Sequence, residues 1–372
     1  MIACLYGRTA EPYVGSAVAD LQASAMARGG EIGALTIETA VRAEHAWESV
    51  ERLYVLPFDV PLHLPDWLPM AVPQLIKALF PRADVVNAPA VHELTWDKLS
   101  MTHRLLERGV PMPESIITND PEEARDFVRG HGEAMLKEPR SCGGHGHVVL
   151  FADAGGAIAG EVPGRRYAVE LAPSGVGRSL AHGVLSCPPP FYLQRLITGV
   201  GRTGVLTPAQ IVRAYVVDGQ VAFYTERYRA RVRRPGDFII NASFGAKYRF
   251  LPAVSDATQT VARRAAEVLG VRAGAVDLIR TGESGPYVLE VDTDGYHMLI
   301  DRGFKQLPEY RDVYDFDDYV ADLLLAPAPE PPRLPRPPRP RPVRPRPPRP
   351  SGAAPRRGPP PRRGTTRPRG RP

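Results

Sequence analysis

The sequence predicts an α/β protein of more than one domain, followed by a tail of different composition. Its 372 residues are too many for one small core. Short apolar runs typical of buried strands alternate with amphipathic stretches of helical period, which is the pattern of α/β folds. Proline and arginine dominate residues 326–372, so we expect the folded part to end near residue 325.

The first part of the chain, residues 1–94, predicts a small α/β domain. Strands are expected at residues 2–7 (IACLYG), 52–58 (RLYVLPF) and 83–89 (ADVVNAP), and a helix that ends at a glycine pair is expected over residues 17–30. The residues after the first strand, GRTAEPYVG, lack the glycine spacing of a dinucleotide site. We therefore expect no dinucleotide site there.

Targeting signals and disulfides are not expected. No apolar run approaches the roughly 18 residues of a membrane helix, and the apolar start MIACLYGR is too short for a signal peptide. The cysteines Cys4, Cys142 and Cys187 occur singly, which fits a reducing compartment better than a disulfide framework. We expect a cytoplasmic protein without a membrane span.

A change of composition near Glu93 introduces a long predicted helix over residues 95–109, TWDKLSMTHRLLERG. Leu99, Leu105 and Leu106 give it an apolar stripe. Gly109 and the VPMP segment that follows are expected to end it.

Residues 134–150, AMLKEPRSCGGHGHVVL, predict two strands joined by a glycine-rich loop. The first strand ends in Lys137. Gly143, Gly144 and Gly146 would let backbone N–H groups approach phosphate oxygens, and Lys137 would add a positive charge beside them. The pattern predicts a phosphate-binding flap on a hairpin rather than a strand-to-helix P-loop.

The same loop also contains potential zinc ligands, namely Cys142, His145 and His147. No second pair of ligands lies at the spacing of known zinc sites. Zinc is therefore not expected here.

Carboxylates alternate along a strand near the end of the folded part. In YVLEVDTDGYH, residues 287–297, Glu290, Asp292 and Asp294 occupy alternate positions and would share one face. Like charges at that spacing repel one another, more strongly when they are partly buried. Something must offset the repulsion.

A hairpin around the TGESGP turn supplies a further acid. A strand is expected at residues 273–280, and the turn would pair Arg280 with Tyr287 and Asp277 with Glu290. Oxygen-only ligands favour Mg²⁺ or Mn²⁺ over zinc, so this cluster predicts a divalent-cation site. The alternative is a solvated sheet face on which the acids pair with arginines.

The order of these motifs resembles the ATP-grasp superfamily, in particular the branch of glutathione synthetase and the ribosomal-protein glutamate ligases. VVNAPAVHELTWDKLSMTHRLLERGVPMP looks like the entry to an ATP-grasp domain. The lysine with its glycine flap, LQRLI, VRAYVVDGQVAFYTERY, IINASFGA and VDLIR…YVLEVD follow in family order. The resemblance spans residues 85–325.

The resemblance implies an architecture. Residues 1–94 would form a small Rossmann-like pre-ATP-grasp domain. Residues 95–188 would form the N-terminal ATP-grasp subdomain with the flap, and residues 189–325 the C-terminal subdomain with the metal site. Residues 326–372 would be a disordered basic tail.

The resemblance also implies roles for residues that match the family motifs. Two lysines would contact the nucleotide phosphates under the flap, and a hinge would meet the adenine edge through its backbone. Two arginines would hold the γ-phosphate or the acceptor carboxylate, and an asparagine would lie beside the transferred phosphate. The lysines are Lys98 and Lys137, and the flap glycines are Gly143, Gly144 and Gly146. The hinge residues are Gln194, Arg195, Leu196 and Ile197. The arginines are Arg213 and Arg227, and the asparagine is Asn241. The Mg²⁺ ligands would be Asp277, Glu290 and Asp292.

Two departures from the family pattern bear on function. Asp292 stands where the family has asparagine, which keeps an oxygen ligand but adds a negative charge. Arg195 stands in the hinge where an acid is frequent. Both leave the expected fold unchanged and bear on the substrate and on activity.

The implied function is an ATP-dependent carboxylate–amine ligase that acts through an acyl phosphate and releases ADP and phosphate. Its substrates would be a small-molecule or peptide carboxylate and an amine, its cofactors ATP and Mg²⁺ (or Mn²⁺), and its assembly a homo-oligomer. The alternative is a nucleotide-binding protein with little ligase activity that the tail recruits to RNA or another polyanion.

The tail changes how the net charge of +6 is distributed. Residues 326–372 contain 14 arginines and one acid, Glu330, and so carry about +13, which leaves about −7 for the rest of the chain. An anionic partner for the tail is one expectation, and low-complexity drift without a partner is the other.

Overall fold

The computed structural model describes residues 1–6, 12–42, 46–56, 74–140, 146–153, 155–175, 178–197, 199–200, 206–207, 210–229, 232, 234–241, 244–280, 285–293 and 316–327. Residues Met1–Ala328 make one compact unit, separate from Pro329–Pro372. The predicted tail therefore lies outside the described residues apart from its first two positions. No described helix is both long and apolar enough to cross a membrane.

The first sheet is parallel and has the strand order β2-β1-β3-β4. Its strands are β1 (Ile2–Tyr6), β2 (Gly33–Thr36), β3 (Arg52–Val55) and β4 (Asp84–Val86), and its helices include α1 (Pro12–Ala27), α2 (Ile37–Arg42) and the short η1 (Ala46–Ser49). Alternate residues of β1 face two different cores: Cys4 lies in one, and Ala3 and Leu5 lie in the other. A parallel sheet covered on both faces, with β1 in its interior, confirms the Rossmann-like first domain.

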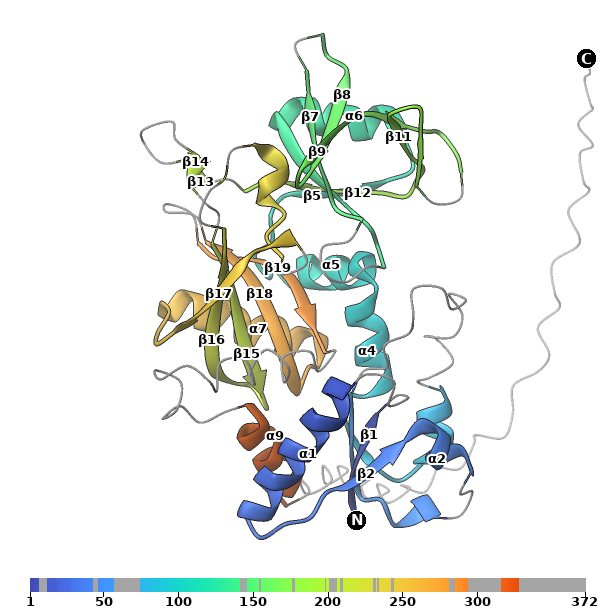
Figure 1. Ribbon diagram of the computed structural model, residues 1–372, viewed down its shortest axis with the longest axis vertical. Coiled ribbons are helices and arrows are strands. Elements are labelled where there is room, and N and C mark those ends of the chain that lie inside the picture. Colours follow the sequence, from blue (N-terminus) through green and yellow to red (C-terminus); the bar gives the residue numbers. More distant parts are fainter. Residues whose placement is uncertain are drawn as a thin grey trace, which may run out of the picture. The chain divides into compact units, whose positions relative to one another are not determined.

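An eight-stranded sheet follows, with the order β10-β11-β9-β8-β7-β6-β12-β5. Figure 1 shows part of this sheet, with α6 beside it. Its strands are β5 (Ser115–Thr118), β6 (Glu133–Lys137), β7 (Val148–Ala152), β8 (Ile158–Val162), β9 (Arg165–Leu171), β10 (Ser179–Ala181), β11 (Val184–Cys187) and β12 (Phe191–Arg195). Helix α6 (Pro121–His131) covers one face with Ala124 and Val128. The opposite face carries Lys137 and Gln194, which line the pocket described below.

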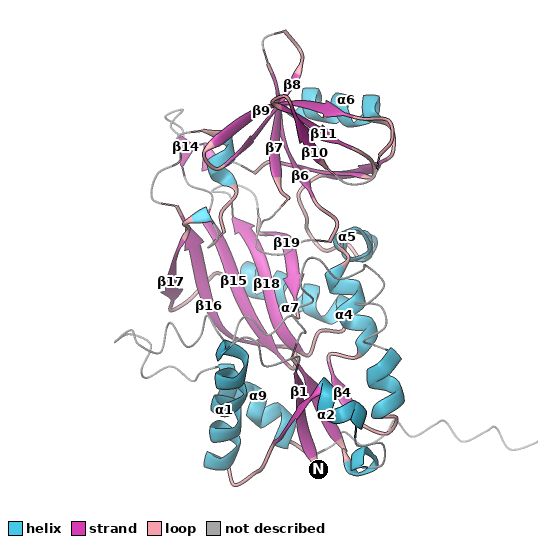
Figure 2. Cartoon of the chain, turned by 45° about the vertical axis from the view of Figure 1, so that its right-hand side comes forward, coloured by secondary structure: helices cyan, strands magenta, loops and turns pink. Residues whose placement is uncertain are grey.

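The third sheet has five antiparallel strands in the order β17-β16-β15-β18-β19 (Figure 2). They are β15 (Gln210–Val217), β16 (Gln220–Tyr228), β17 (Lys247–Leu251), β18 (Ala273–Arg280) and β19 (Tyr287–Asp292), and a two-stranded ribbon of β13 (Gly199–Val200) and β14 (Leu206–Thr207) precedes them. Helix α7 (Asp256–Leu269) packs on one face, and α9 (Phe316–Leu325) with α1 packs on the other. Sheets and helices in this mixture confirm the predicted α/β class.

The helix predicted over residues 95–109 is wrong in one respect, because the structure divides this region into α4 (Pro89–Trp96) and α5 (Lys98–Glu107). Asp97 lies between them with extended backbone, and its side chain accepts a hydrogen bond from the backbone N–H of Leu99 at 3.0 Å. This is N-cap geometry. Lys98 becomes the first residue of α5, and its side chain is buried.

The predicted β18–β19 hairpin forms, and Asp277 pairs with Glu290 as expected. The predicted pair of Arg280 and Tyr287 is wrong, since Tyr287 pairs with Ile279. A β-bulge between Asp277 and Leu278 inserts one extra residue into β19 and shifts the register beyond it by one. Asp292 pairs with Ala275, two positions from Asp277, so the acids remain on one face.

Candidate functional site

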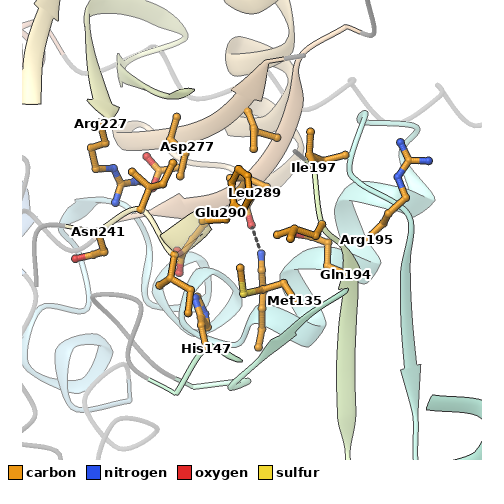
Figure 3. Close-up of a pocket in the computed structure, with 17 residues that line it drawn as sticks. Met135, His147, Gln194, Arg195, Ile197, Arg227, Asn241, Asp277, Leu289 and Glu290 are labelled. Carbon is orange, nitrogen blue, oxygen red and sulfur yellow. Dashed lines mark hydrogen bonds and ion pairs between the residues drawn. The ribbon is translucent and has the colours of Figure 1, made fainter. Parts of the chain in front are cut away.

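A pocket lies between the eight-stranded and five-stranded sheets (Figure 3). One wall comes from β6, β12 and His147, which immediately precedes β7, another from β15, β16, β18 and β19, and a third from the segment around η2 (Pro235–Phe238). The lining is apolar at one end and charged at the other. Its residues are Met135, Lys137, His147, Gln194, Arg195, Leu196, Ile197, Ile211, Arg227, Phe238, Ile239, Ile240, Asn241, Asp277, Ile279, Leu289 and Glu290.

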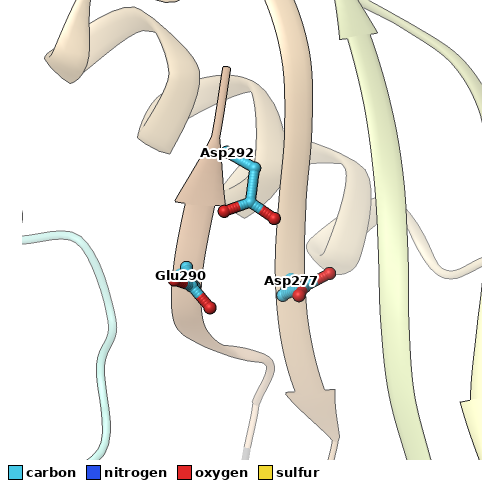
Figure 4. Close-up of side chains that lie close together, drawn as sticks. All are labelled: Asp277, Glu290 and Asp292. Carbon is cyan, nitrogen blue, oxygen red and sulfur yellow. The ribbon is translucent and has the colours of Figure 1, made fainter. Parts of the chain in front are cut away.

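Three carboxylates meet at the charged end. One ligand oxygen from each of Asp277, Glu290 and Asp292 lies within 4.8 Å of the others (Figure 4). Asp277 comes from β18 and the other two from alternate positions of β19. An all-oxygen set at this spacing is the donor chemistry of a magnesium site, so the residues fit the predicted cation.

Two arginines offset much of the negative charge. Arg213 donates to both carboxylate oxygens of Asp277 at 2.7 and 2.9 Å, and to Asp292 at 2.5 Å. Arg227 on β16, one strand beyond β15, also donates to Asp277. Pairing with arginines was the alternative to a metal site at these acids. The structure shows this pairing, and it involves the same acids that could bind a metal.

Lys98 neutralises the third acid. Its Nζ lies 2.6 Å from Oε1 of Glu290, and only 4% of the lysine side chain is exposed. Burial by itself would raise the pKa of Glu290, but the ammonium groups of Lys98 and Lys137 outweigh it and lower this pKa to about 2. Glu290 is therefore ionised throughout the physiological range and available as a ligand.

Lys137 is the last residue of β6 and lines the same pocket as the carboxylates Asp277 and Glu290. Its ammonium group donates to the backbone carbonyl of Leu289 at 3.2 Å and lies 5.6 Å from the ring centroid of Tyr192. Burial lowers the pKa of Lys137 to about 8, with Glu290 opposing this shift and Lys98 adding to it. The carbonyl of Leu289 belongs to the segment where β19 bulges, so the bulge helps to position this lysine.

The hinge predicted at residues 194–197 lines the apolar end of the pocket. The backbone N–H of Arg195 donates to the backbone carbonyl of Glu114, and that of Leu196 donates to the backbone carbonyl of Glu133. Among the described residues none accepts from the N–H of Ile197. Within the described part of the chain, this N–H is therefore open to a ligand two residues beyond the end of β12.

The side chain of Gln194 is held in place by its neighbours. Its amide nitrogen donates to Ser115 at 3.2 Å and to the hydroxyl of Tyr192 at 3.4 Å, and that hydroxyl is bonded to Thr102 at 2.7 Å. Burial raises the pKa of Tyr192 to about 12, so its hydroxyl stays protonated. With the amide nitrogen engaged, the amide oxygen is the group left to face the pocket.

A loop after β16 forms the remaining wall. It carries Phe238, Ile239, Ile240 and Asn241, of which the first three are buried. Arg229 stabilises this loop, because its guanidinium donates hydrogen bonds to the backbone carbonyls of Ile239 and Phe244. Asn241 lines the pocket as well, and its place beside a transferred phosphate stays a prediction.

Glu161 ties this wall to the eight-stranded sheet. Its buried carboxylate accepts from the backbone N–H of Gly236 at 3.2 Å. A Cβ at Gly236 would lie 2.7 Å from the backbone oxygen of Val162, so only glycine fits the contact.

Most of the predicted site residues converge on this pocket. Gly143, Gly144 and Asp294 lie outside the described residues, as do Cys142 and His145. Gly146 is described and has φ of +72°, with a Cβ there falling 2.8 Å from that of Glu138, so this end of the flap requires glycine. Lys98 and Arg213 reach the acidic cluster through the ion pairs above.

Several lining residues carry no recognisable motif in the sequence. Met135, Leu289 and the apolar residues around η2 look like ordinary core positions in the sequence. His147 was considered only as a zinc ligand, although it lines the pocket beside Lys137. The alternation that places Met135 and Lys137 on one face of β6 was the signal that could have identified Met135.

The chain was compared with known proteins. No protein-family model matches it. A probable α-L-glutamate ligase of Xylella fastidiosa (strain M12) is 28% identical over 199 residues, which cover 53% of this chain and 54% of that protein. The chain thus spans about half the length of that relative.

Solved structures share the fold. ATP-grasp ligase PsnB, complexed with minimal precursor, Mg and ADP, gives a TM-score of 0.53 at 19% identity and covers 87% of this chain and 96% of that one. D-cycloserine synthetase DcsG gives 0.53 at 15% identity, with 87% and all of the two chains covered. These similarities confirm the resemblance inferred from the sequence: the chain has the ATP-grasp fold and resembles the glutamate ligase branch of that superfamily.

Proposed function

We propose that the protein is an ATP-dependent ligase that joins a carboxylate to an amine through an acyl-phosphate intermediate. The observation that carries the proposal is the pocket's polarity. An apolar end, where no described residue accepts from the backbone N–H of Ile197, leads to a charged end with three clustered carboxylates and two buried lysines. This order matches the base and the polyphosphate of a nucleotide.

The apolar end would hold the adenine. Met135 from β6 and Phe238 from η2 offer apolar surfaces for a flat base. The N–H of Ile197 would donate to a ring nitrogen, and the oriented amide oxygen of Gln194 would accept from the exocyclic amino group. Guanine presents a carbonyl at that position and would meet an acceptor there, so the arrangement favours adenine.

The charged end would hold the phosphates. Lys98 and Lys137 are both buried, so each attracts an anion more strongly than a solvated lysine would. Asp277, Glu290 and Asp292 would hold Mg²⁺, which when bound neutralises phosphate charge and orients the triphosphate. The arginines now paired with these acids could then turn toward the γ-phosphate or the acceptor carboxylate.

The chemistry requires positioning and charge neutralisation more than a nucleophilic side chain. A carboxylate oxygen of the substrate attacks the γ-phosphorus, and the bond to the bridging oxygen of ADP breaks. The amine then attacks the acyl carbon, phosphate leaves, and the amine loses a proton. Arg213, Arg227 and Lys137 would stabilise the negative charge that shifts during both steps.

The substrate class is open between peptides and small molecules. PsnB is described in complex with a precursor, and DcsG is a D-cycloserine synthetase, so the same fold serves both kinds of substrate. The relatives named as glutamate ligases add support for an amino-acid or peptide substrate.

The test is ATP turnover with Mg²⁺ and hydroxylamine against pools of amino acids, peptides and small carboxylic acids. Hydroxylamine captures an acyl phosphate as a hydroxamate, and mass spectrometry then identifies the activated acid. A hydroxamate that the wild type forms and Glu290→Ala does not form would support the ligase. ADP binding without turnover in any pool would overturn it in favour of a nucleotide-binding protein.

The tail separates the two functions further. A ligase should keep its turnover when residues 329–372 are removed and lose it in Lys137→Ala. A protein recruited to a polyanion by its arginines should show the reverse, with binding to RNA lost on truncation and kept in Lys137→Ala.

A further inference from the structure

His147 occupies a position in the pocket to which the proposed reaction assigns no role. It is the last residue before β7, and its neighbour Val148 pairs with Leu136 on β6. Lys137 follows Leu136, so His147 and Lys137 stand opposite each other where the hairpin opens into the glycine-rich loop. Figure 3 shows His147 among the pocket-lining side chains, on the side of Glu290 and Asn241.

The imidazole has a polar atom that the described residues do not satisfy. Its Nε2 is buried and makes no hydrogen bond within the described part of the chain. A buried polar ring nitrogen without a partner is destabilising, so such an atom at a pocket wall points to a ligand.

The electrostatic surroundings define the ligand's charge. Burial, reinforced by the positive charges of Lys137 and Lys98 and opposed by Glu290, lowers the pKa of His147 to about 3. The ring is therefore neutral at physiological pH. A neutral imidazole with two buried ammonium groups nearby is a poor place for a metal cation and a good place for an oxyanion.

We propose that His147 binds the polyphosphate of the nucleotide by donating an N–H hydrogen bond from Nε2 to a phosphoryl oxygen. The inference rests on the proposed nucleotide-binding function. It gives the residue just before β7 a part in phosphate binding that is separate from the charge of Lys137. The bond is neutral on the protein side, so it adds direction without adding charge.

The experiment measures nucleotide affinity by isothermal titration calorimetry, in the full-length protein, with Mg–ADP and with adenosine as probes. His147→Leu removes the N–H and keeps an apolar side chain of similar size. His147→Gln restores an amide N–H at a similar distance from the backbone. His92→Gln is the matched control, because His92 is also a buried histidine with an unpartnered Nε2 among the described residues but does not line the pocket.

His147→Leu should weaken Mg–ADP binding roughly tenfold to a hundredfold, the range expected for a hydrogen bond to a charged group. Its affinity for adenosine should not change, because adenosine has no phosphate. His147→Gln should recover most of the ADP affinity, and His92→Gln should leave both affinities at the wild-type value.

Several results would overturn the inference. Unchanged ADP affinity in His147→Leu would do so while leaving the proposed function intact. Equal losses for ADP and adenosine, together with a lower melting temperature, would show that His147 only supports the pocket. Failure of the wild type to bind Mg–ADP at all would overturn the proposed function first, and the role of His147 with it.

Discussion

Asp277 and Glu290 face each other as a direct cross-strand pair of β18 and β19, and each is held by a different cation. Asp277 is bonded to Arg213 and Arg227, whereas Glu290 is bonded to Lys98 from the start of α5. Directly opposed carboxylates destabilise a sheet unless their charge is compensated. The compensation thus comes from β15, β16 and α5, which ties α5 to the five-stranded sheet at this site.

The acidic cluster should be essential for turnover. Asp277→Asn and Glu290→Gln each remove one negative charge from the proposed magnesium site, and we expect turnover to fall about 10²–10³-fold, as when one group that stabilises transition-state charge is lost. Steady-state ADP release at saturating Mg²⁺ measures this. Glu170→Gln on the exposed part of β9 is the control. Wild-type turnover in either cluster variant would show that the acids serve only to pair with the cations.

Asp292 is the acid that departs from the family pattern, and its extra charge is matched in the structure by Arg213 at 2.5 Å. Asp292→Asn keeps an oxygen ligand, so we expect turnover to persist while the Mg²⁺ concentration for half-maximal rate rises, because one charge is lost. A Mg²⁺ titration of the rate, repeated with Mn²⁺, measures the shift. An Asp292→Asn enzyme with unchanged metal dependence would mean that Asp292 acts on Arg213 alone.

Arg213 and Asp277 form a buried ion pair, with 7% and 5% of their side chains exposed. Arg213→Met leaves Asp277 partly uncompensated, and breaking a buried pair costs about 3–5 kcal/mol of unfolding free energy. Arg104→Met is the control, since Arg104 belongs to an exposed pair with Glu107 that contributes little. Urea unfolding measures both.

Added Mg²⁺ extends the Arg213 test. In Arg213→Met a cation bound by the acids would replace the lost positive charge, so Mg²⁺ should raise the melting temperature of this variant more than that of the wild type. Equal increments in the two proteins would argue against a metal at these acids.

The acidic hairpin illustrates what the sequence alone could supply. Alternation along β19 and the turn before it were enough to pair Asp277 with Glu290, because strand period and hairpin geometry act locally. The bulge in β19 was not foreseen, since a single extra residue leaves no mark on side-chain pattern. Because the bulge was not predicted, the position of the Leu289 carbonyl was not predicted either. The hydrogen bond that Lys137 donates to this carbonyl was therefore missed as well.

The break between α4 and α5 and the strand β9 were not predicted, although each has a local signal in the sequence. Asp97 followed by Lys-Leu-Ser is an N-cap pattern, and it divides the predicted helix where the structure does. The alternating run RRYAVEL of β9 predicts a half-exposed strand and would have pointed to the strands between β7 and β12. By contrast, the meeting of Met135, Phe238 and Ile197 depends on how two sheets pack, which no local pattern encodes. The domain boundaries at residues 94, 188 and 325 stay predictions.

The Asp97 cap should affect both stability and nucleotide binding. Asp97→Ala removes the bonds to the N–H of Leu99 and to the hydroxyl of Ser100, and the loss of an N-cap costs about 0.5–2 kcal/mol. Asp120→Ala at the start of α6 is the matched control, because Asp120 caps its helix in the same way without adjoining a pocket lysine. We expect similar losses of stability in chemical unfolding, but a higher KM for ATP only in Asp97→Ala. A raised KM in both variants would assign the effect to general destabilisation.

The charge of Lys137 should set an upper pH limit for nucleotide binding. Its pKa is lowered from 10.5 to about 8, so the ammonium form is nearly complete at pH 6.5 and is lost as the pH rises through about 8. Affinity for Mg–ADP should therefore fall between about pH 7.5 and 9 in the wild type, with adenosine affinity constant over the same range. Lys137→Arg keeps its positive charge across this range and should remove the decline, because the pKa of arginine lies above 12. Calorimetric titrations at pH 6.5, 8 and 9.5 measure the effect in both proteins. If the affinity of Lys137→Arg falls with pH as the wild type's does, another group controls binding and Lys137 is charged throughout.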